Sequence, residues 1–389
     1  MSLYLTLNGR FLGRPVTGVD RVAIELTRAI GDVLAELGSE SGSLTIAIPP
    51  GDPTRIDLTA EYFGRNLPVK VTGTRGGHAW EQLVLAGYRR HDWLLNLCNT
   101  GPISRRRQMV LMHDAQFISH PDSYSLPFRA WYRFLLSMLG RRAAAIFTVS
   151  HASRTMLEKY GVVPQGKAHV IRLGVDHIRR LEADATISER LGIMPHRYVL
   201  AIGSLARHKN IARLVDAFVA ADLPGIRLVI AGGGNPTIFR AAGLPTAANV
   251  DYIGRVSDAE LKWLYANATA FACPSLSEGF GLPPLEAMST GCPVVATTGG
   301  AVPEVCGDAA CYADPLDTAA WTTALCRVVL DENFRTDLAR RSLERAAGFT
   351  WAHAARQVLA DLAGRDGATA LQARLIADIA APCDSVHQH

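Results

Sequence analysis

Short runs of β-branched and other apolar residues alternate along the chain with segments of helical periodicity, and this alternation occurs in two successive series. The pattern is typical of parallel sheets covered by helices on both faces. The first series predicts strands over residues 3–9, 43–50, 69–73, 93–97, 108–114, 145–150 and 168–174. The second predicts strands over residues 198–204, 227–233, 250–255, 270–275 and 293–298. It also predicts helices over 210–221 and 258–267, the latter with a capping box of Ser257 and Glu260. We therefore expect an α/β fold with two doubly wound, Rossmann-like parallel sheets.

Two series of strands predict two domains, and the length of 389 residues agrees, because one hydrophobic core seldom organises so long a chain. Turn-forming residues over 188–197, among them Pro195, mark a linker. We predict an N-terminal Rossmann-like domain over residues 1–190 and a C-terminal one over 191–389, whose final helices can cross back to the first domain. Ligands of open α/β sheets bind at the carboxyl ends of the strands, so we expect a site in the cleft between the two sheets.

The composition indicates a globular chain without a membrane-spanning segment. Hydrophobic residues make up 48% and charged residues 20% of the chain, which is enough apolar material for a packed core. The most apolar stretch, 126–147, contains four arginines, and the first residues lack the basic start and apolar core of a signal peptide. Seven scattered cysteines form no CxxC pair and indicate reduced thiols. We therefore expect a cytoplasmic location.

The charge is distributed unevenly between the two halves. Residues 1–195 contain 24 Lys/Arg and 17 Asp/Glu, a net charge of +7, whereas the remainder carries 16 and 19, a net charge of −3. No nucleic-acid motif accompanies the basic half, so we expect no nucleic acid but a phosphorylated lipid or the inner, anionic face of the cytoplasmic membrane. The basic groups expected to face it are Arg89-Arg90, Arg105-Arg106-Arg107 and Arg141-Arg142. A stripe over residues 131–136 either dips into that membrane or belongs to the core.

The most informative motif is AFACPSLSEGFGLPPLEAMSTGCPVVATTGGAVPEV, residues 270–305. A strand ends before a loop that holds Glu278 and Gly281, and Pro283 and Pro284 then start a helix. Free amides at that helix start, with glycines that allow close approach, form a cradle for a phosphate. We place Glu286 in the first helical turn, where its carboxylate can accept hydrogen bonds from vicinal hydroxyls of a sugar. Either glutamate taken alone is more simply explained as an ordinary acid, on a surface loop for Glu278 and in a first helical turn for Glu286.

This motif, with its two glutamates eight residues apart, resembles the donor-site signature of glycosyltransferase family 4, the retaining enzymes of the GT-B fold. Further segments agree in order: VTGVDR at 16–21, VLMHDAQFISHP at 110–121, TVSHASR at 148–154, VIRLGVD at 170–176, AIGSLARHKN at 201–210 and VDYIGRVSDAELKWLYANA at 250–268. The resemblance spans nearly the whole chain. The HD and TGVxR elements are similar to those of the mannosyltransferase-like branch.

The resemblance implies a role for each matching residue. Glu286 would bind the ribose hydroxyls of a nucleotide sugar, Glu278 the transferred sugar, and Lys209 the diphosphate, where negative charge develops in the transition state. Backbone amides would hold donor oxygens at Phe280, Gly281 and Leu282. A solvated surface lysine is the alternative for Lys209.

Three further positions are implied at lower similarity. Arg207 would replace an arginine that many relatives place beside the lysine, or it is a surface arginine. Gly18 would approach the donor phosphate, assisted by Arg21, or it is a turn glycine. His113 would contact the donor sugar, or it is a structural histidine.

The resemblance implies a retaining hexosyltransferase without a metal or a cofactor other than its nucleotide-sugar donor. The chain contains no Asp-x-Asp pair, the motif that holds a metal in other glycosyltransferases. We expect transfer of mannose from GDP-mannose to a hydroxyl of a polyprenyl-diphosphate-linked or other glycan, in bacterial surface polysaccharide synthesis. UDP-glucose or another UDP-hexose is the alternative donor. A sugar-nucleotide epimerase or hydrolase on the same scaffold, or a non-catalytic binding protein, is the alternative of another class.

Overall fold

The computed structural model describes residues 2–51, 54–64, 67–119, 121–203, 206–233 and 247–380. The chain divides into two compact units. Unit 1 comprises Met1–Ser119, Tyr124–Gly174 and Thr350–His389, and unit 2 comprises His120–Ser123 and Val175–Phe349. The division predicted after residue 190 lies within unit 2, and the segment from residue 350 onward belongs to unit 1.

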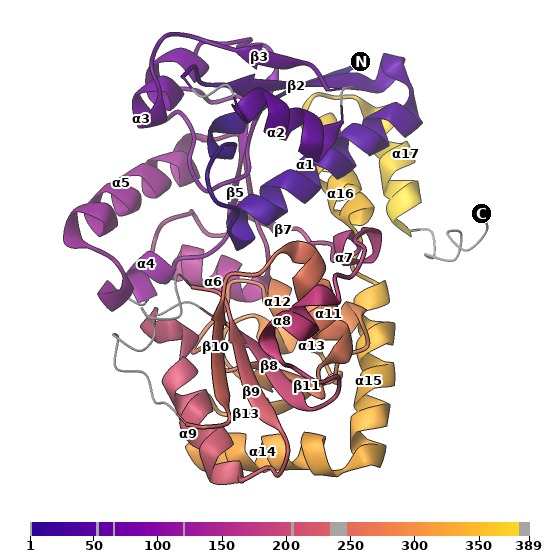
Figure 1. Cartoon of the computed structure of the whole chain (residues 1–389). Coiled ribbons are helices and arrows are strands. Elements are labelled where there is room, and N and C mark those ends of the chain that lie inside the picture. Colours follow the sequence, from indigo (N-terminus) through magenta and orange to yellow (C-terminus); the bar gives the residue numbers. More distant parts are fainter. Residues whose placement is uncertain are drawn as a thin grey trace. The chain divides into compact units, whose positions relative to one another are not determined.

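Unit 1 is built on a seven-stranded parallel sheet with the strand order β3-β2-β1-β4-β5-β6-β7. Its strands are β1 (Leu3–Asn8), β2 (Gly42–Ile48), β3 (Val69–Val71), β4 (Trp93–Asn96), β5 (Gln108–Met112), β6 (Ala145–Thr148) and β7 (Ala168–Val170). Figure 1 labels its strands β2, β3, β5 and β7. Every strand predicted in the first series is present. The strand order reverses between β1 and β4, which creates a topological switch point at their carboxyl ends.

Helices cover the sheet of unit 1. They are α1 (Gly18–Leu37), α2 (Thr54–Phe63), α3 (Gly77–Trp80), α4 (Gln116–Ser119), α5 (Leu126–Arg142), α6 (His151–Lys159), α16 (Trp351–Arg365) and α17 (Thr369–Ala380). Helix α1 begins where the Asp20 carboxylate accepts the Thr17 backbone N–H at 3.0 Å, and it ends at Gly38, whose φ of 89° is accessible to glycine. Helix α16 packs against α1 although more than 300 residues of chain separate the two.

Unit 2 is built on a six-stranded parallel sheet with the order β10-β9-β8-β11-β12-β13. Its strands are β8 (Tyr198–Ile202), β9 (Arg227–Ala231), β10 (Val250–Gly254), β11 (Ala270–Cys273), β12 (Val294–Thr297) and β13 (Ala310–Ala313). The prediction missed β13, a short edge strand without β-branched residues. Residue 204, the last of the predicted strand 198–204, lies outside the described residues. The switch point of this sheet lies between β8 and β11.

The helices of unit 2 are α7 (His177–Arg180), α8 (Thr186–Leu191), α9 (Ile211–Ala221), α11 (Asp258–Asn267), α12 (Leu282–Ser289), α13 (Val302–Cys306), α14 (Thr318–Leu330) and α15 (Glu332–Ala347). The capping box predicted at α11 is confirmed, because Ser257 and Glu260 satisfy each other's backbone N–H groups. Helices α9 and α14 pack on the sheet around the buried side chains of Phe218 and Trp321.

The aromatic stripe of α5 divides between core and surface. Leu135 and Leu136 are buried in the core of unit 1, whereas Trp131 is 40% and Phe134 53% exposed. Leu126, at the start of the same helix, is 74% exposed. No helix within the described residues is both long and apolar enough to cross a bilayer.

Two of the arginines predicted to face an anionic partner, Arg105 and Arg107, instead bind groups within unit 1. For Arg105 the prediction is wrong, because this side chain is 5% exposed and donates to the backbone carbonyls of Tyr88 and Asp92. Burial lowers the pKa of Arg105 to about 10. Arg107 pairs with Asp366 at 2.6 Å, so both arginines hold unit 1 together. The cysteines within the described residues are free thiols, and Cys383 lies outside those residues.

Candidate active site

Two charged side chains meet at the switch point of unit 2. Lys209 ends a short 3-10 turn, Arg207–Lys209, after β8, and Glu278 lies in the loop after the neighbouring strand β11. The Lys209 Nζ atom lies 2.7 Å from Glu278 Oε1, and both side chains remain partly accessible to solvent. The hydroxyl of Ser275, which the sequence analysis did not single out, donates to the same carboxylate oxygen at 2.5 Å. The structure therefore brings together two of the predicted residues in a position where open α/β sheets bind ligands.

Backbone contacts hold the loop that carries Glu278. The Leu276 N–H donates to the carbonyl of His208 at 2.7 Å, which joins this loop to the turn of Lys209. On its other side the loop packs against Gly299 and Gly300, where a Cβ would lie 2.2 Å from the Leu276 carbonyl oxygen and 2.5 Å from that of Glu278. Glycine at both positions therefore permits the close approach that positions the carboxylate.

The start of α12 follows Glu278 closely in the chain and supplies backbone N–H groups that can bind a ligand. Gly281 precedes the helix with a φ of 96°, in the left-handed region that favours glycine, and Pro283 follows in the first turn. No acceptor among the described residues takes the N–H groups of Phe280, Gly281 or Leu282. These donors and the positive end of the helix dipole suit an anion. Phe280 itself is buried, with its ring edge-on to Phe349.

Glu286 lies deeper than the sequence predicts. The expectation that it occupies the first turn of the helix is wrong, because α12 begins at Leu282 and its first turn holds no acidic residue. The side chain is nearly buried, and its two oxygens lie 3.0 Å from His177 Nε2 and 3.0 Å from the Tyr265 hydroxyl. Burial and the adjacent carboxylate raise the pKa of Tyr265 well above its usual range, so this hydroxyl donates. His177 and Tyr265 left no signal in the sequence, because each comes from a different helix.

The predicted residues of the first half lie in unit 1. Gly18 is the first residue of α1, where a Cβ would meet no atom within 4 Å, so the space above this helix start is open. His113 follows β5 and is buried, with its Nε2 2.9 Å from the Leu97 carbonyl oxygen. Burial lowers the pKa of His113, although the Leu97 carbonyl and the nearby carboxylates act in the opposite direction. The imidazole is therefore neutral at pH 7 and donates to Leu97.

A buried polar network at the switch point of unit 1 was missed by the sequence analysis. Glu81, which is fully buried, accepts hydrogen bonds from Asn8 Nδ2 at 2.7 Å and from Thr100 Oγ1 at 3.0 Å, and Arg10 Nε lies at 3.4 Å. Burial alone would raise the pKa of Glu81, but the adjacent His78, the charge of Arg10 and the hydrogen bonds from Asn8 and Thr100 lower it. Asn8 and Asn96 end the adjacent strands β1 and β4 and bond to each other, a polar pairing that is visible in the sequence once the strand order is known.

Arg207 and Arg21 are the remaining residues that the sequence predicts for the site. Arg207 is exposed on the turn before Lys209, whereas the intervening His208 is buried. The Arg21 Nη1 atom lies 3.9 Å from Oε1 of Glu25, which follows one turn further along α1. Within the part of the chain that the structure describes, no three His, Cys, Asp or Glu side chains gather closely enough to hold a metal ion.

Two models of known families match the chain. The model for glycosyl transferases group 1 matches residues 184–345, which include Lys209, Glu278 and Glu286. The model for Glycosyltransferase Family 4 matches residues 91–179, which include His113. The chain belongs to glycosyltransferase family 4. It is a glycosyltransferase with the two Rossmann-like sheets of the GT-B fold.

Individual relatives extend this similarity over most of the chain. The O-antigen chain mannosyltransferase B of Escherichia coli is 28% identical over 367 residues, which cover 89% of this chain and 95% of that protein. The O-antigen chain mannosyltransferase RfbU of Salmonella typhimurium is 31% identical over 228 residues, 57% of this chain and 60% of that protein. The crystal structure of Anabaena Alr3699/HepE in complex with UDP and glucose covers 94% of this chain and 100% of its own, with a TM-score of 0.70 at 19% identity.

Proposed function

We propose that this family 4 glycosyltransferase transfers mannose from GDP-mannose, with retention of configuration and without a metal ion, to a hydroxyl of a lipid-linked glycan in bacterial surface polysaccharide synthesis. Unit 2 would hold the nucleotide sugar and unit 1 the acceptor. The observation that carries the proposal is the Lys209–Glu278 ion pair of 2.7 Å at the switch point, followed in the chain by the free amides at the start of α12.

Each group has a distinct task in this proposal. The Lys209 ammonium and the amides of Phe280 to Leu282 neutralise the diphosphate, where negative charge increases as the bond to the sugar breaks. Glu278 accepts hydrogen bonds from the hydroxyls of the transferred sugar. Glu286, whose carboxylate His177 and Tyr265 orient, accepts those of the ribose.

The proposed reaction is a front-face displacement. The bond between the anomeric carbon and the diphosphate oxygen breaks, and the acceptor oxygen forms its bond to that carbon on the same face. The proton of the acceptor hydroxyl passes to the departing diphosphate oxygen. Among the predicted residues Glu278 is engaged with Lys209 and Ser275, so the proposal assigns it binding of the sugar rather than nucleophilic attack.

The choice of donor rests on the relatives. Two O-antigen chain mannosyltransferases are similar to this chain, which supports mannose as the transferred sugar. A UDP-hexose is the second candidate, because a solved structure of the same fold was obtained with UDP and glucose.

For the acceptor we propose that unit 1 contacts an anionic membrane surface through α5. Leu126, Trp131 and Phe134 are exposed on this helix, and Arg133 lies exposed among them. Exposed aromatic side chains beside arginine suit the interface of a membrane with anionic headgroups.

The test uses the purified full chain with a polyprenyl-diphosphate-linked glycan acceptor and, in separate reactions, GDP-mannose, UDP-glucose and UDP-N-acetylglucosamine, each with and without EDTA. We expect transfer from GDP-mannose alone, unaffected by EDTA, and an axial anomeric linkage by NMR that matches the donor. Transfer only from a UDP-hexose supports the second candidate. Donor turnover without any acceptor supports an epimerase or hydrolase, and an inverted product contradicts the front-face reaction.

Liposome sedimentation tests the membrane contact. The double variant Trp131→Ala/Phe134→Ala should lose binding to anionic vesicles while it retains transfer to a water-soluble acceptor. Leu343→Ala, which removes a half-exposed leucine from α15 in unit 2, is the matched control. Binding that is independent of anionic lipid and salt contradicts this contact.

A further inference from the structure

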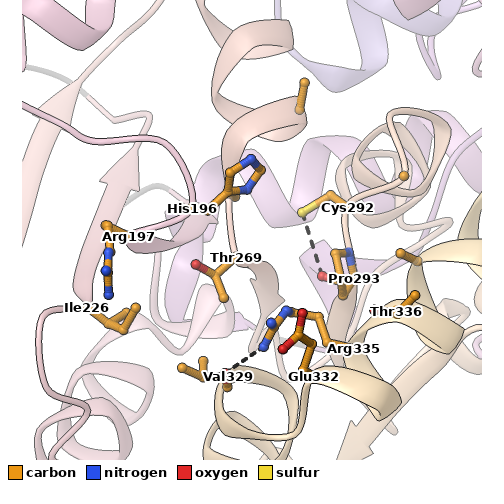
Figure 2. A pocket seen from close by; sticks show the side chains of 14 residues that line it. His196, Arg197, Ile226, Thr269, Cys292, Pro293, Val329, Glu332, Arg335 and Thr336 are labelled. Atoms are coloured by element: carbon orange, nitrogen blue, oxygen red, sulfur yellow. Dashed lines mark hydrogen bonds between the residues drawn. The ribbon is translucent and has the colours of Figure 1, made fainter.

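Unit 2 has a cavity at the amino ends of its strands, whereas Lys209 and Glu278 lie beyond the carboxyl ends. The volume of the cavity is about 500 Å³, in the range of small-molecule sites. Arg197 directly precedes β8, Ile226 precedes β9, Thr269 precedes β11 and Pro293 precedes β12, so the cavity is formed at the amino ends of these strands. Residues of the first two turns of α15 close one side of it (Figure 2).

Two arginines and a histidine line the cavity. Figure 2 shows His196 and Arg197 on one side and Arg335, from α15, on another. The Arg335 guanidinium donates through Nη1 to the Val329 carbonyl at 2.7 Å, which fixes its position. No ion pair within the described residues engages Arg197 or Arg335, so both charges remain available to an anion. Guanidinium groups bind phosphoryl oxygens through parallel hydrogen bonds.

The backbone at His196 is held in an uncommon conformation. Its φ is 56°, in the left-handed region, and its N–H donates to the Asn267 carbonyl at 2.7 Å. Such conformations cluster at binding sites, where the surrounding structure maintains them. The conformation places the exposed imidazole on the wall of the cavity beside Arg197.

Two further groups on the wall suit hydroxyls. The side chain of Thr269 is 7% exposed, and its Oγ1 has no hydrogen-bond partner among the described residues, which is unusual for a buried hydroxyl. Glu332, exposed in the first turn of α15, has no ion pair of its own there and accepts hydrogen bonds only. One carboxylate beside two guanidinium groups and an imidazole favours a ligand that is anionic at one end and carries hydroxyls at the other.

We propose that this cavity binds a hexose monophosphate, with the phosphoryl group on Arg197, His196 and Arg335 and the sugar hydroxyls on Glu332 and Thr269. The site is separate from the nucleotide-sugar site, because the two lie at opposite ends of the same strands, and it does not depend on the function proposed above.

Titration calorimetry on the full chain tests the site with mannose 6-phosphate, mannose and inorganic phosphate as probes. We expect mannose 6-phosphate to bind, mannose not to bind, and inorganic phosphate to bind at least fivefold more weakly than the sugar phosphate, roughly one lost hydrogen bond to a charged group. Arg197→Gln should weaken the binding of mannose 6-phosphate about tenfold or more. Thr269→Val, which keeps the shape of a side chain whose hydroxyl has no partner, should weaken it about threefold to tenfold without lowering the melting temperature.

Two controls separate this site from others. Arg340→Gln removes an exposed arginine from α15 outside the cavity and should leave binding unchanged. Lys209→Ala and saturating GDP should also leave it unchanged. Absence of binding to the wild type at millimolar concentration, unchanged binding in Arg197→Gln, or loss of binding in Lys209→Ala overturns the proposal. Inorganic phosphate that binds as tightly as the sugar phosphate also overturns it.

Discussion

The switch points of the two sheets have the same strand topology and opposite chemistry. In unit 1 the carboxyl ends of β1 and β4 meet over Glu81, which is fully buried and bonded to Asn8, Thr100 and Arg10. In unit 2 the ends of β8 and β11 meet at Lys209 and Glu278, which form one ion pair and stay partly exposed. Loss of a buried charge that neighbouring protein groups hold destabilises the fold, whereas a charge pair that solvent can reach is available to a substrate.

The largest expected effect on activity concerns Lys209, in the accessible ion pair of unit 2. Lys209→Ala should lower kcat for sugar transfer about 100-fold to 1000-fold, because it removes the charge proposed to neutralise the diphosphate. The melting temperature should stay within about 2 °C of the wild type, since a partly exposed ion pair contributes little stability. Steady-state kinetics and calorimetry measure both quantities, with Arg340→Gln as the control. A variant that keeps full activity would remove Lys209 from the site.

Glu81 should show the reverse behaviour. Glu81→Gln removes a buried charge and leaves Arg10 without its carboxylate, so the free energy of unfolding should fall by about 2–4 kcal/mol. Chemical denaturation followed by tryptophan fluorescence measures this loss. Glu61→Gln, at an exposed position of α2, is the matched control. An unchanged stability together with a lost activity would give Glu81 a role in the reaction instead.

The pH dependence of stability tests the buried state of His113. Since its pKa is lowered in the folded chain, the unfolded chain takes up a proton near the ordinary value of 6.5 that the folded chain does not. The contribution of His113 to stability is therefore constant above that pH and falls as the pH decreases below it, by at most about 1.4 kcal/mol per pH unit. His113→Gln should reduce this slope between pH 6.5 and 5. His353→Gln should reduce it too, because burial and nearby arginines lower the pKa of His353.

The smallest effect concerns Ser275. Ser275→Ala removes the hydrogen bond of 2.5 Å to Glu278 and should lower kcat about threefold to tenfold, while the melting temperature changes little. Ser342→Ala, a buried serine of α15 that donates to the Ala309 carbonyl, is the control and should leave kcat unchanged. Equal rates for both variants would mean that Ser275 does not position the carboxylate.

Much of the architecture was predictable, because it depends on local patterns. The periodicity predicted every strand except β13, and capping residues predicted the start of α11. The loop with Glu278 and the proline-started helix α12 were also predictable, since glycine and proline restrict the backbone directly. Glu286 is the fifth residue of α12 and lies just beyond the predicted first turn, because the helix begins one residue earlier, at Leu282, after the left-handed Gly281.

Other features of the site could not be predicted, because they join residues far apart in the chain. His177 and Tyr265 reach Glu286 from two other helices, and Glu81 meets Asn8 across 73 positions. Arg105 was expected on a basic surface because its neighbours in sequence are charged. Its side chain is instead buried and donates hydrogen bonds to five backbone carbonyls.

The sequence by itself determined the strands, the loops that follow them and the family, because these follow from short-range backbone preferences and contiguous motifs. Only the tertiary structure decided which strands are neighbours, and therefore that Lys209 and Glu278 meet at one switch point while Glu81 is buried at the other. Strand order and burial depend on packing between distant segments, and desolvation then determines whether a charge stabilises the fold or remains available to a ligand.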